Sequence, residues 1–180
     1  MTPQDIIRFW AEDVGEKHWF ERDAALDFEI ARRFGETYAL ARDGKLSDWE
    51  NTADGALALL LLLDQFPRNM FRSEPEAFAT DEKARAIADR AIARGFDLQV
   101  AQSLRPFFYL PLMHSEHLAD QDRCVALVSE RLGKDSSNYP YALAHRDVIA
   151  KFGRFPGRNV ALGRQSTPEE LHFLHNDPPF

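Results

Sequence analysis

The leucine-rich segment from Ala56 to Leu63 constrains the fold more than any other part of this 180-residue sequence. It is an uninterrupted apolar run of eight residues, six of them leucine. Wound as an α-helix at about 100° per residue, the leucines face every direction, so the helix must be surrounded by other helices. A membrane-spanning helix needs roughly 20 apolar residues. The run therefore predicts a buried core helix and no membrane association.

Composition indicates that the rest of the chain is helical as well. Ala and Leu, which favour helices, number 43, against 17 for Ile, Val and Thr, and no segment alternates as a strand would. Thr2-Pro3 and Thr167-Pro168 each place a capping hydroxyl before a proline at the first helical position. We expect helices at about 3–13, 23–42, 51–65, 81–94, 98–105, 111–132, 140–152 and 168–175.

Short connections between such helices favour antiparallel hairpins stacked on one another. The sequence therefore predicts an all-α fold, a compact bundle or a short solenoid resembling tetratricopeptide repeats. We expect a single domain over residues 1–180, with a loosely ordered tail at about 176–180.

The distribution of charge argues against nucleic acid as a partner. Residues 1–65 hold 7 basic and 14 acidic side chains, whereas residues 66–180 hold 15 of each, and a duplex-binding domain shows the reverse imbalance. Residues 145–164 are a local exception with a net charge of +4, which is suited to a small anion. The single cysteine, Cys124, permits no intrachain disulfide, and the charged N-terminus does not resemble a signal peptide, so we expect a cytoplasmic protein.

Several polar residues occupy positions where the helical pattern calls for apolar ones. On a continuous helix from Pro111, the side chains of His114, His117 and Gln121 share the apolar stripe, and Ser115 faces the polar side. His145 lies on the inward face of the next helix. Each histidine alone is explained by a hydrogen bond in the core. Three together indicate a polar site, because neutral imidazole exchanges protons near pH 7.

Asp64 ends the leucine helix, where burial and the helix dipole both oppose a carboxylate. It therefore needs a cationic or hydrogen-bonding partner. We take Asp64, His114 and His145 as tentative catalytic residues.

Two similar segments, Phe66-Pro67-Arg68-Asn69 and Phe155-Pro156-Gly157-Arg158-Asn159, follow predicted helices. In each, Pro is expected to stop the helix, and the Arg has two possible roles: it binds orphan helix carbonyls, or it binds an anion. The candidate ligand-binding residues are Arg68, Asn69, His117, Gln121, Arg154, Arg158 and Asn159.

Other chemistries have weaker signals. His114 and His117 are three residues apart and have Asp64, Glu116 or His145 as possible co-ligands, but no His-Glu-x-x-His string occurs, so we expect neither a metal nor a cofactor. Cys124 is expected to be an inert core thiol. Asp23 and Asp27 are expected on the solvated first turns of a helix.

Motifs along nearly the whole chain carry a family resemblance. They are Phe9-Trp10, Trp19-Phe20 with Asp23 and Asp27, Leu62 to Asn69, His114-Ser115-Glu116 with Gln121, and Phe152-Gly153-Arg154-Phe155-Pro156 with Arg158-Asn159. In this order they resemble the bacterial domain-of-unknown-function family nine hundred and twenty-four. The resemblance implies an all-α, tetratricopeptide-like fold and brings no established activity, cofactor or partner. A histidine is common in that family where this chain has Gly157, which counts against a mechanism with an imidazole there.

Our preferred hypothesis is an internal pocket that binds a small carboxylate or phosphate. Asp64, His114, His117, Gln121 and His145 would line it, and Arg68, Arg154 and Arg158 would stand at its rim. One alternative is a hydrolase in which a histidine is the general base, Asp64 orients it and the guanidinium groups stabilise negative charge. Another is a scaffold that binds a protein or peptide in a groove.

Overall fold

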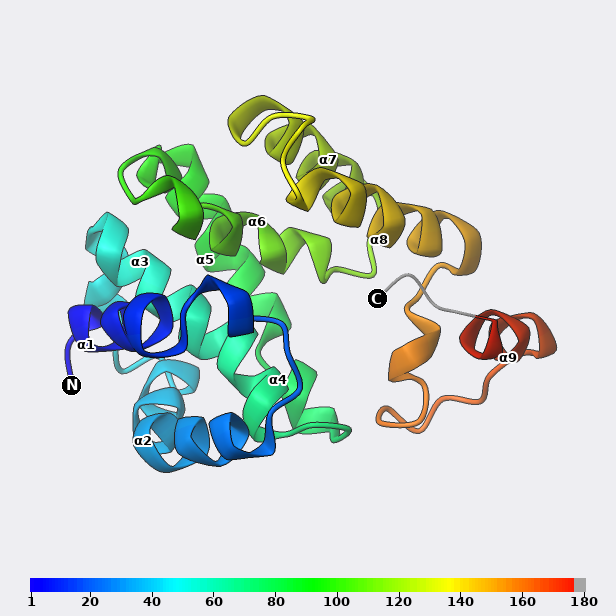
Figure 1. Ribbon diagram of the computed structural model, residues 1–180, viewed down its shortest axis with the longest axis horizontal. Helices are drawn as coiled ribbons and strands as arrows, with labels where there is room; N and C mark the ends of the chain where they lie inside the picture. Colours follow the sequence, from blue (N-terminus) through cyan, green and yellow to red (C-terminus); the bar gives the residue numbers. More distant parts are fainter. Residues whose placement is uncertain (177–180) are drawn as a thin grey trace. The chain divides into compact units, whose positions relative to one another are not determined.

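The computed structural model describes residues 1–176, and its regular elements are all helical, which confirms the all-α prediction (Figure 1). The α-helices of this region are α1 (Pro3–Arg8), α2 (Ala24–Arg42), α3 (Ala53–Leu60), α4 (Phe66–Met70), α5 (Asp81–Ala93), α6 (Pro106–Met113), α7 (Leu118–Arg131), α8 (Asn138–Phe152) and α9 (Pro168–His175). None of these helices has the length and apolar character needed to cross a bilayer. The tail predicted at about 176–180 lies, apart from Asn176, outside the described residues.

The chain forms two compact units. Unit 1 comprises Met1–Arg72 and Glu76–Pro111, and unit 2 comprises Ser73–Pro75 and the chain from Leu112 onward. Unit 1 therefore holds α1 to α5 and most of α6, whereas unit 2 holds the end of α6 and α7 to α9.

The leucine helix forms the core of unit 1, as predicted. All residues of α3 from Gly55 onward are buried, and so is the π-helical turn Leu61–Gln65 that continues it. Helices α1 and α5 pack against α3, while α2 packs against α4 and the π-helical turn. Burial of an apolar side chain contributes about 1.5–3 kcal/mol, so this segment is a large share of the driving force for folding.

Pro67 does not end the leucine helix, so the prediction of a helix-stopping corner is wrong here. The chain stays helical through α4, which directly follows the π-helical turn Leu61–Gln65. Pro67 has no N–H to donate to the carbonyl of Leu63, four residues earlier. The buried hydroxyl of Thr80 donates to that oxygen at 2.6 Å. A side chain from the start of the next helix thus makes the proline tolerable.

The Phe155-Pro156 segment does end a helix, as predicted. Helix α8 stops at Phe152, and Gly153 has a left-handed φ of 68°, a conformation that favours glycine. Phe155 is extended, and Pro156 opens a short 3₁₀ turn. The two similar sequence segments therefore have different backbones.

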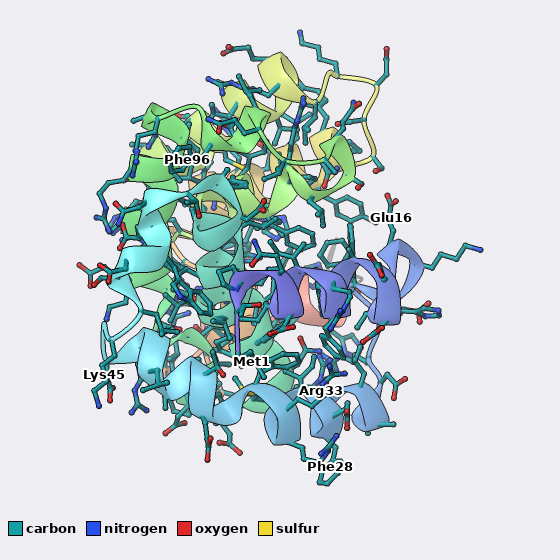
Figure 2. All side chains as sticks on the ribbon, turned by 90° about the vertical axis from the view of Figure 1, so that its left-hand side faces the viewer. Met1, Glu16, Phe28, Arg33, Lys45 and Phe96 are labelled. Carbon is teal, nitrogen blue, oxygen red and sulfur yellow. The ribbon has the colours of Figure 1, made fainter. Side chains whose placement is uncertain are left out.

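Helix α2 carries one side chain that points into solvent and one that packs against the preceding segment (Figure 2). Phe28 points away from the helix into solvent and is 69% exposed. Arg33 turns toward the preceding segment, where its guanidinium lies 4.6 Å from the centre of the Phe9 ring and 3.5 Å from an oxygen of Asp13. A cation over an aromatic face is attracted by the ring's quadrupole.

The predicted helix at 111–132 is two helices in the structure, which corrects that boundary. Helix α6 ends at Met113, and α7 begins after His117, whose backbone is extended. Between them the Ser115 hydroxyl accepts the His117 N–H at 3.2 Å and donates to Asp120 Oδ2 at 2.5 Å. A serine that satisfies the backbone in this way competes with helix formation. The predicted helix at 98–105 is likewise replaced by two 3₁₀ turns, Phe96–Leu98 and Gln102–Leu104.

Helices α7 and α8 pack against each other as a hairpin in unit 2 (Figure 1). Arg146 of α8 and Asp122 of α7 form an ion pair across it, with Nε and Oδ1 2.9 Å apart. Helix α9 places Phe173 on Phe152, with ring centroids 5.1 Å apart. Both rings cover a small core of Val148, Ile149 and Phe155.

Candidate functional site

The carbonyl groups at the end of α6 are bound by side chains from two later segments. Gln121 Nε2 donates to the Met113 oxygen at 2.6 Å and to the Ser115 oxygen at 2.7 Å. Arg158 Nη2 donates to the His114 oxygen at 2.8 Å. The last carbonyls of a helix have no partners within the helix, and a cation near them is favoured by the dipole. Two of the predicted ligand-binding residues therefore help to form this turn.

Two of the three predicted inward histidines lie side by side in unit 2. The ring centroids of His114 and His145 are 6.3 Å apart, and both side chains are half-buried. His145 Nδ1 donates to the Tyr141 carbonyl oxygen at 2.8 Å, which fixes the orientation of its ring. His117 is exposed at the start of α7, so the prediction that it shares their inward stripe is wrong. The break in the helix redirects it.

Phe155 connects His145 with Arg158. Its ring meets the His145 ring edge to face, with centroids 5.7 Å apart and planes at 72°. The Arg158 guanidinium lies 4.6 Å from the centre of the same ring. His145 and Arg158 therefore contact one buried phenylalanine, and His114 joins the group through the His145 ring and through its own carbonyl oxygen, which Arg158 binds.

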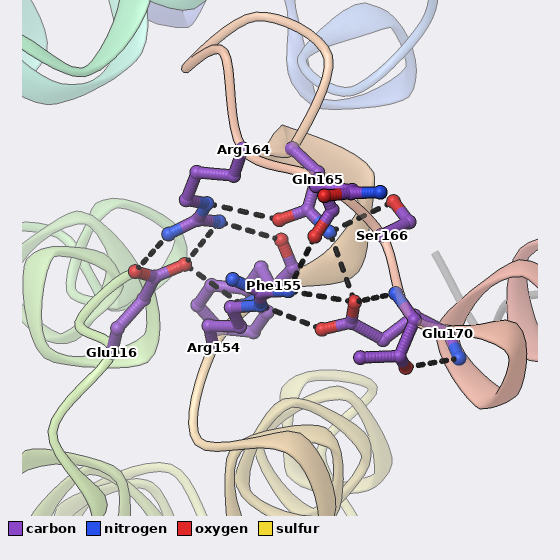
Figure 3. A network of polar contacts seen from close by, with 9 residues as sticks. Glu116, Arg154, Phe155, Arg164, Gln165, Ser166 and Glu170 are labelled. Atoms are coloured by element: carbon purple, nitrogen blue, oxygen red, sulfur yellow. Dashed lines mark hydrogen bonds and ion pairs between the residues drawn. The ribbon is translucent and has the colours of Figure 1, made fainter.

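A network of polar contacts lies next to the backbone of Phe155 (Figure 3). Glu116 and Arg164 form a double ion pair, with N···O distances of 2.7 and 3.0 Å. Arg164 Nε also donates to Asn159 Oδ1 at 2.9 Å. Asn159 is fully buried, and its Nδ2 donates to Ser166 Oγ at 3.0 Å. The candidate residue Asn159 thus lies inside the network.

Arg154 and Glu170 form the second double ion pair of the network. Arg154 Nε and Nη2 donate to the two Glu170 oxygens at 2.6 and 2.8 Å, and Nη2 also donates to the Gln165 carbonyl oxygen at 2.9 Å. Glu170 additionally accepts the N–H of Thr167 at 2.8 Å, which completes the helix cap expected at Thr167-Pro168. The Arg154 guanidinium, with the Thr167 N–H, lowers the pKa of Glu170 to about 2, so this carboxylate is ionised at neutral pH.

In the folded protein, carboxylates from other segments offset much of the positive charge of the basic stretch 145–164. Four of its five cations face carboxylates from other parts of the chain. The four pairs are Arg146 with Asp122, Lys151 with Glu169, Arg154 with Glu170, and Arg164 with Glu116. The fifth, Arg158, contacts the His114 carbonyl and the Phe155 ring.

The predicted site residues of unit 1 form a separate cluster. Asp64 is 1% exposed and accepts a hydrogen bond from Gln65 Nε2 at 2.6 Å. Arg68 Nη1 lies 3.4 Å from Asp64 Oδ1, so the buried carboxylate has the cationic partner that the sequence requires. Arg68 also binds both oxygens of Asp81, at 2.9 and 3.0 Å, and so connects α4 to the first turn of α5.

Asn69 belongs to a neighbouring contact in unit 1. Its Nδ2 donates to Asp27 Oδ1 at 2.8 Å, and Arg72 holds both oxygens of the same carboxylate. Asp27 is therefore not on a solvated face, which corrects that prediction, whereas Asp23 caps α2 as an exposed residue. Tertiary contacts that no local pattern encodes hold Asp27.

Metal binding and thiol chemistry are the two other possibilities that the sequence raises. No group of three His, Cys, Asp or Glu side chains within residues 1–176 is arranged to hold a metal ion. Cys124 is buried, and burial raises the pKa of its thiol to about 12, as expected of an inert core cysteine. Ser115 is 2% exposed, so the prediction that it faces the polar side is wrong.

Three residues that the sequence did not assign to the anion site are central to the network. From the sequence, Glu116 is a possible metal co-ligand and part of a family motif, Arg164 is part of the basic stretch, and Glu170 is part of a helix start. The motif Thr167-Pro168-Glu169-Glu170 was a usable signal, because the Glu of a capping box is oriented back toward the chain before the helix. No local sequence pattern predicts that Glu116 pairs with Arg164, which lies 48 positions later.

The fold and the site define an all-α protein with Arg–carboxylate pairs in both units and two neighbouring histidines in unit 2. Residues 6–177 match the family model described as "Bacterial protein of unknown function (DUF924)", so the chain belongs to this family. A solved structure of a protein of unknown function, ATU0120 from Agrobacterium tumefaciens, is 44% identical and superposes with a TM-score of 0.92, covering 97% of each chain. A search of curated proteins finds no match.

Proposed function

We propose that unit 2 binds a small anion, a carboxylate or a phosphate, beside His114, His145 and Arg158. The observation that carries this proposal is the proximity of these groups. The two imidazole centroids are 6.3 Å apart, Arg158 donates to the His114 carbonyl oxygen, and the His145 ring and the Arg158 guanidinium both contact the Phe155 ring. Guanidinium and imidazole N–H groups are the donors that bind carboxylate and phosphate oxygens most strongly.

Each residue has a distinct part in the proposed site. Arg158 supplies the permanent charge, and its bond to the His114 oxygen sets the direction of the guanidinium plane. His145, held by the Tyr141 carbonyl, presents its Nε2 in a fixed direction and adds charge when protonated. Because the dipole at the end of α6 opposes an anion, the affinity depends on Arg158.

The other predicted ligand residues have supporting parts in this proposal. Gln121 shapes the turn that carries His114, and Arg154 and Asn159 hold the chain on either side of Phe155. Exposed His117 is assigned an outer position.

The three predicted site residues of unit 1 are not part of the proposed anion site. We assign Asp64 and Arg68 to a second polar cluster and Asn69 to the neighbouring contact with Asp27.

A ligand titration tests the proposal. The protein is dialysed and its unfolding temperature is measured with inorganic phosphate and, separately, with acetate. A ligand at 100 times its dissociation constant stabilises the folded state by about 2.7 kcal/mol. We expect one of the two anions to raise the unfolding temperature, and Arg158→Met to abolish that rise. An absence of stabilisation by both anions in the wild-type protein would refute the proposal.

A matched control is available in the same basic stretch. Arg146 is next to His145 in sequence, but its guanidinium pairs with Asp122. Arg146→Met removes the same charge and is expected to preserve the response to the anion. If both variants lose the response equally, general electrostatics rather than the proposed site explains the binding.

A hydrolytic activity is the second candidate, and one observation favours it. Because His145 Nδ1 is hydrogen-bonded to a carbonyl oxygen, the proton is on Nδ1 and Nε2 is the basic nitrogen, as a general base requires. Release of p-nitrophenol from p-nitrophenyl phosphate and p-nitrophenyl acetate measures this activity. It should occur in the wild-type protein and disappear in folded His145→Gln; equal rates in both would exclude His145 as the base.

A further inference from the structure

One ion pair holds both backbone groups of the phenylalanine at the centre of the proposed site. Glu116 Oε1 accepts the Phe155 N–H at 2.8 Å, and Arg164 Nη2 donates to the Phe155 carbonyl oxygen at 3.0 Å. Figure 3 shows Glu116 and Arg164 facing each other next to this backbone. With both its N–H and its C=O bound, Phe155 has little freedom in φ and ψ.

The ring of Phe155 transmits this constraint to the proposed ligand groups. Phe155 is 5% exposed. The centroid of its ring lies 5.7 Å from that of the His145 ring and 4.6 Å from the Arg158 guanidinium. A rotation of the Phe155 backbone would move the ring and would change the separation of the imidazole and the guanidinium. The relative geometry of the imidazole and the guanidinium thus depends on a residue that is itself uncharged.

We propose that the Glu116–Arg164 ion pair is a positioning device that fixes Phe155 and thereby sets the relative placement of His145 and Arg158. The inference rests on the proposed function, because His145 and Arg158 are the groups assigned to the anion. Glu116 and Arg164 do not bind the anion themselves. They determine whether the groups that bind it are correctly spaced.

The charge state of Glu116 is consistent with this role. Burial alone would raise the pKa of its carboxyl, but the hydrogen bonds from Arg164 and the Phe155 N–H outweigh burial and lower the pKa below the ordinary value of 4.5. The carboxylate is therefore ionised at neutral pH and accepts charge-assisted hydrogen bonds, which are the stronger kind. A neutral amide at this position would still accept from Phe155 but would hold Arg164 weakly.

The second ion pair of the network provides a matched control. Arg154 and Glu170 form a double ion pair of the same kind, and Glu170 contacts Asn159, but the contacts of Glu170 do not include the backbone of Phe155 in the described part of the chain. Glu170→Gln and Glu116→Gln are the same chemical change in the same network. Only the second is expected to move the Phe155 ring.

The test measures ring placement in the ligand-free protein. Imidazole C–H resonances are recorded by NMR, and those of His145 are assigned with His145→Gln and confirmed as sensitive to the ring with Phe155→Leu. We expect Glu116→Gln and Arg164→Lys to shift the His145 resonances, and Glu170→Gln to leave them in place. Circular dichroism establishes which variants are folded, and Arg164→Lys decides the question if Glu116→Gln does not fold.

The outcomes separate this inference from the proposed function. Unchanged His145 resonances in a folded Glu116→Gln or Arg164→Lys variant overturn the inference, and so does an equal shift in Glu170→Gln. Inorganic phosphate is then titrated, and Glu116→Gln is expected to bind it about tenfold more weakly, the lower end of the effect of removing an orienting outer partner at metal sites. If the wild-type protein does not bind phosphate or acetate, the proposed function fails, while the ligand-free spectra still decide the positioning role.

Discussion

Replacement of Gln121 by leucine is the sharpest test of how the turn beneath the candidate site is held. Gln121 is fully buried, and its amide nitrogen donates to two carbonyl oxygens, those of Met113 and Ser115, which also belong to buried residues. Leucine has a similar size but no donor. Gln121→Leu therefore leaves two buried acceptors unpaired without creating a large cavity.

The expected cost follows from these contacts. An unpaired buried acceptor costs about 1–3 kcal/mol, so two cost about 2–6 kcal/mol. Part of this cost is offset, because the Gln121 Oε1 atom is itself buried without a hydrogen-bond partner in the described region. Its removal relieves a penalty of about 1–3 kcal/mol. We expect a net destabilisation of about 1–3 kcal/mol.

Urea unfolding followed by circular dichroism measures this difference. With a slope of about 1–3 kcal/mol per molar urea, the midpoint should fall by on the order of 1 M. Ala126→Leu, an apolar substitution at an exposed position of the same helix, serves as the control and should change stability by less than about 0.5 kcal/mol. A Gln121→Leu protein as stable as the wild type would show that the amide does not hold the turn, and would refute the reasoning.

Three further predictions concern single contacts. Because Arg154 depresses the pKa of Glu170 to about 2 from an ordinary 4.5, its contribution to stability is present above about pH 4.5 and is lost as the pH falls toward 2; acid unfolding of Glu170→Gln should lack this part of the pH dependence. Cys124, with a pKa raised to about 12 by burial, should react with Ellman's reagent at pH 8 only after denaturation. Thr80→Val should destabilise the protein by about 1–3 kcal/mol in urea unfolding, because the Leu63 carbonyl loses its donor.

Each of these has a result that contradicts it. Parallel acid-unfolding curves for the wild type and Glu170→Gln would mean that the ion pair does not stabilise the fold. Rapid labelling of Cys124 in the native protein would mean that the thiol is accessible. A Thr80→Val protein with an unchanged midpoint, alongside Thr80→Ser as the conservative control, would mean that the carbonyl finds another donor.

The helical core is the part of the structure that the sequence predicted best. A run of leucines on every face of a helix has one physical solution in water, which is complete enclosure, and all six leucines are buried. Helix starts at Thr2 and Thr167 were equally predictable, because a cap is a contact between residues three positions apart.

The interrupted helix between α6 and α7 shows where local patterns failed. His114, His117 and Gln121 fit one stripe on a continuous helix, but α6 ends at Met113 and α7 begins only after His117. Whether the helix continues past Met113 depends on the Ser115 hydroxyl, which competes with the helix for the backbone N–H of His117. Periodicity alone does not measure that competition.

By itself, then, the sequence determined the all-α class, the buried leucine helix and the existence of polar residues that needed partners, because these follow from properties of single segments. Only the tertiary structure decided which partners they found: Arg68 with Asp81, Arg154 with Glu170, and Arg164 with Glu116. The physical reason is that an ion pair depends on distance in space, and residues separated by 13 to 48 positions are brought within 3 Å by packing that no local pattern encodes.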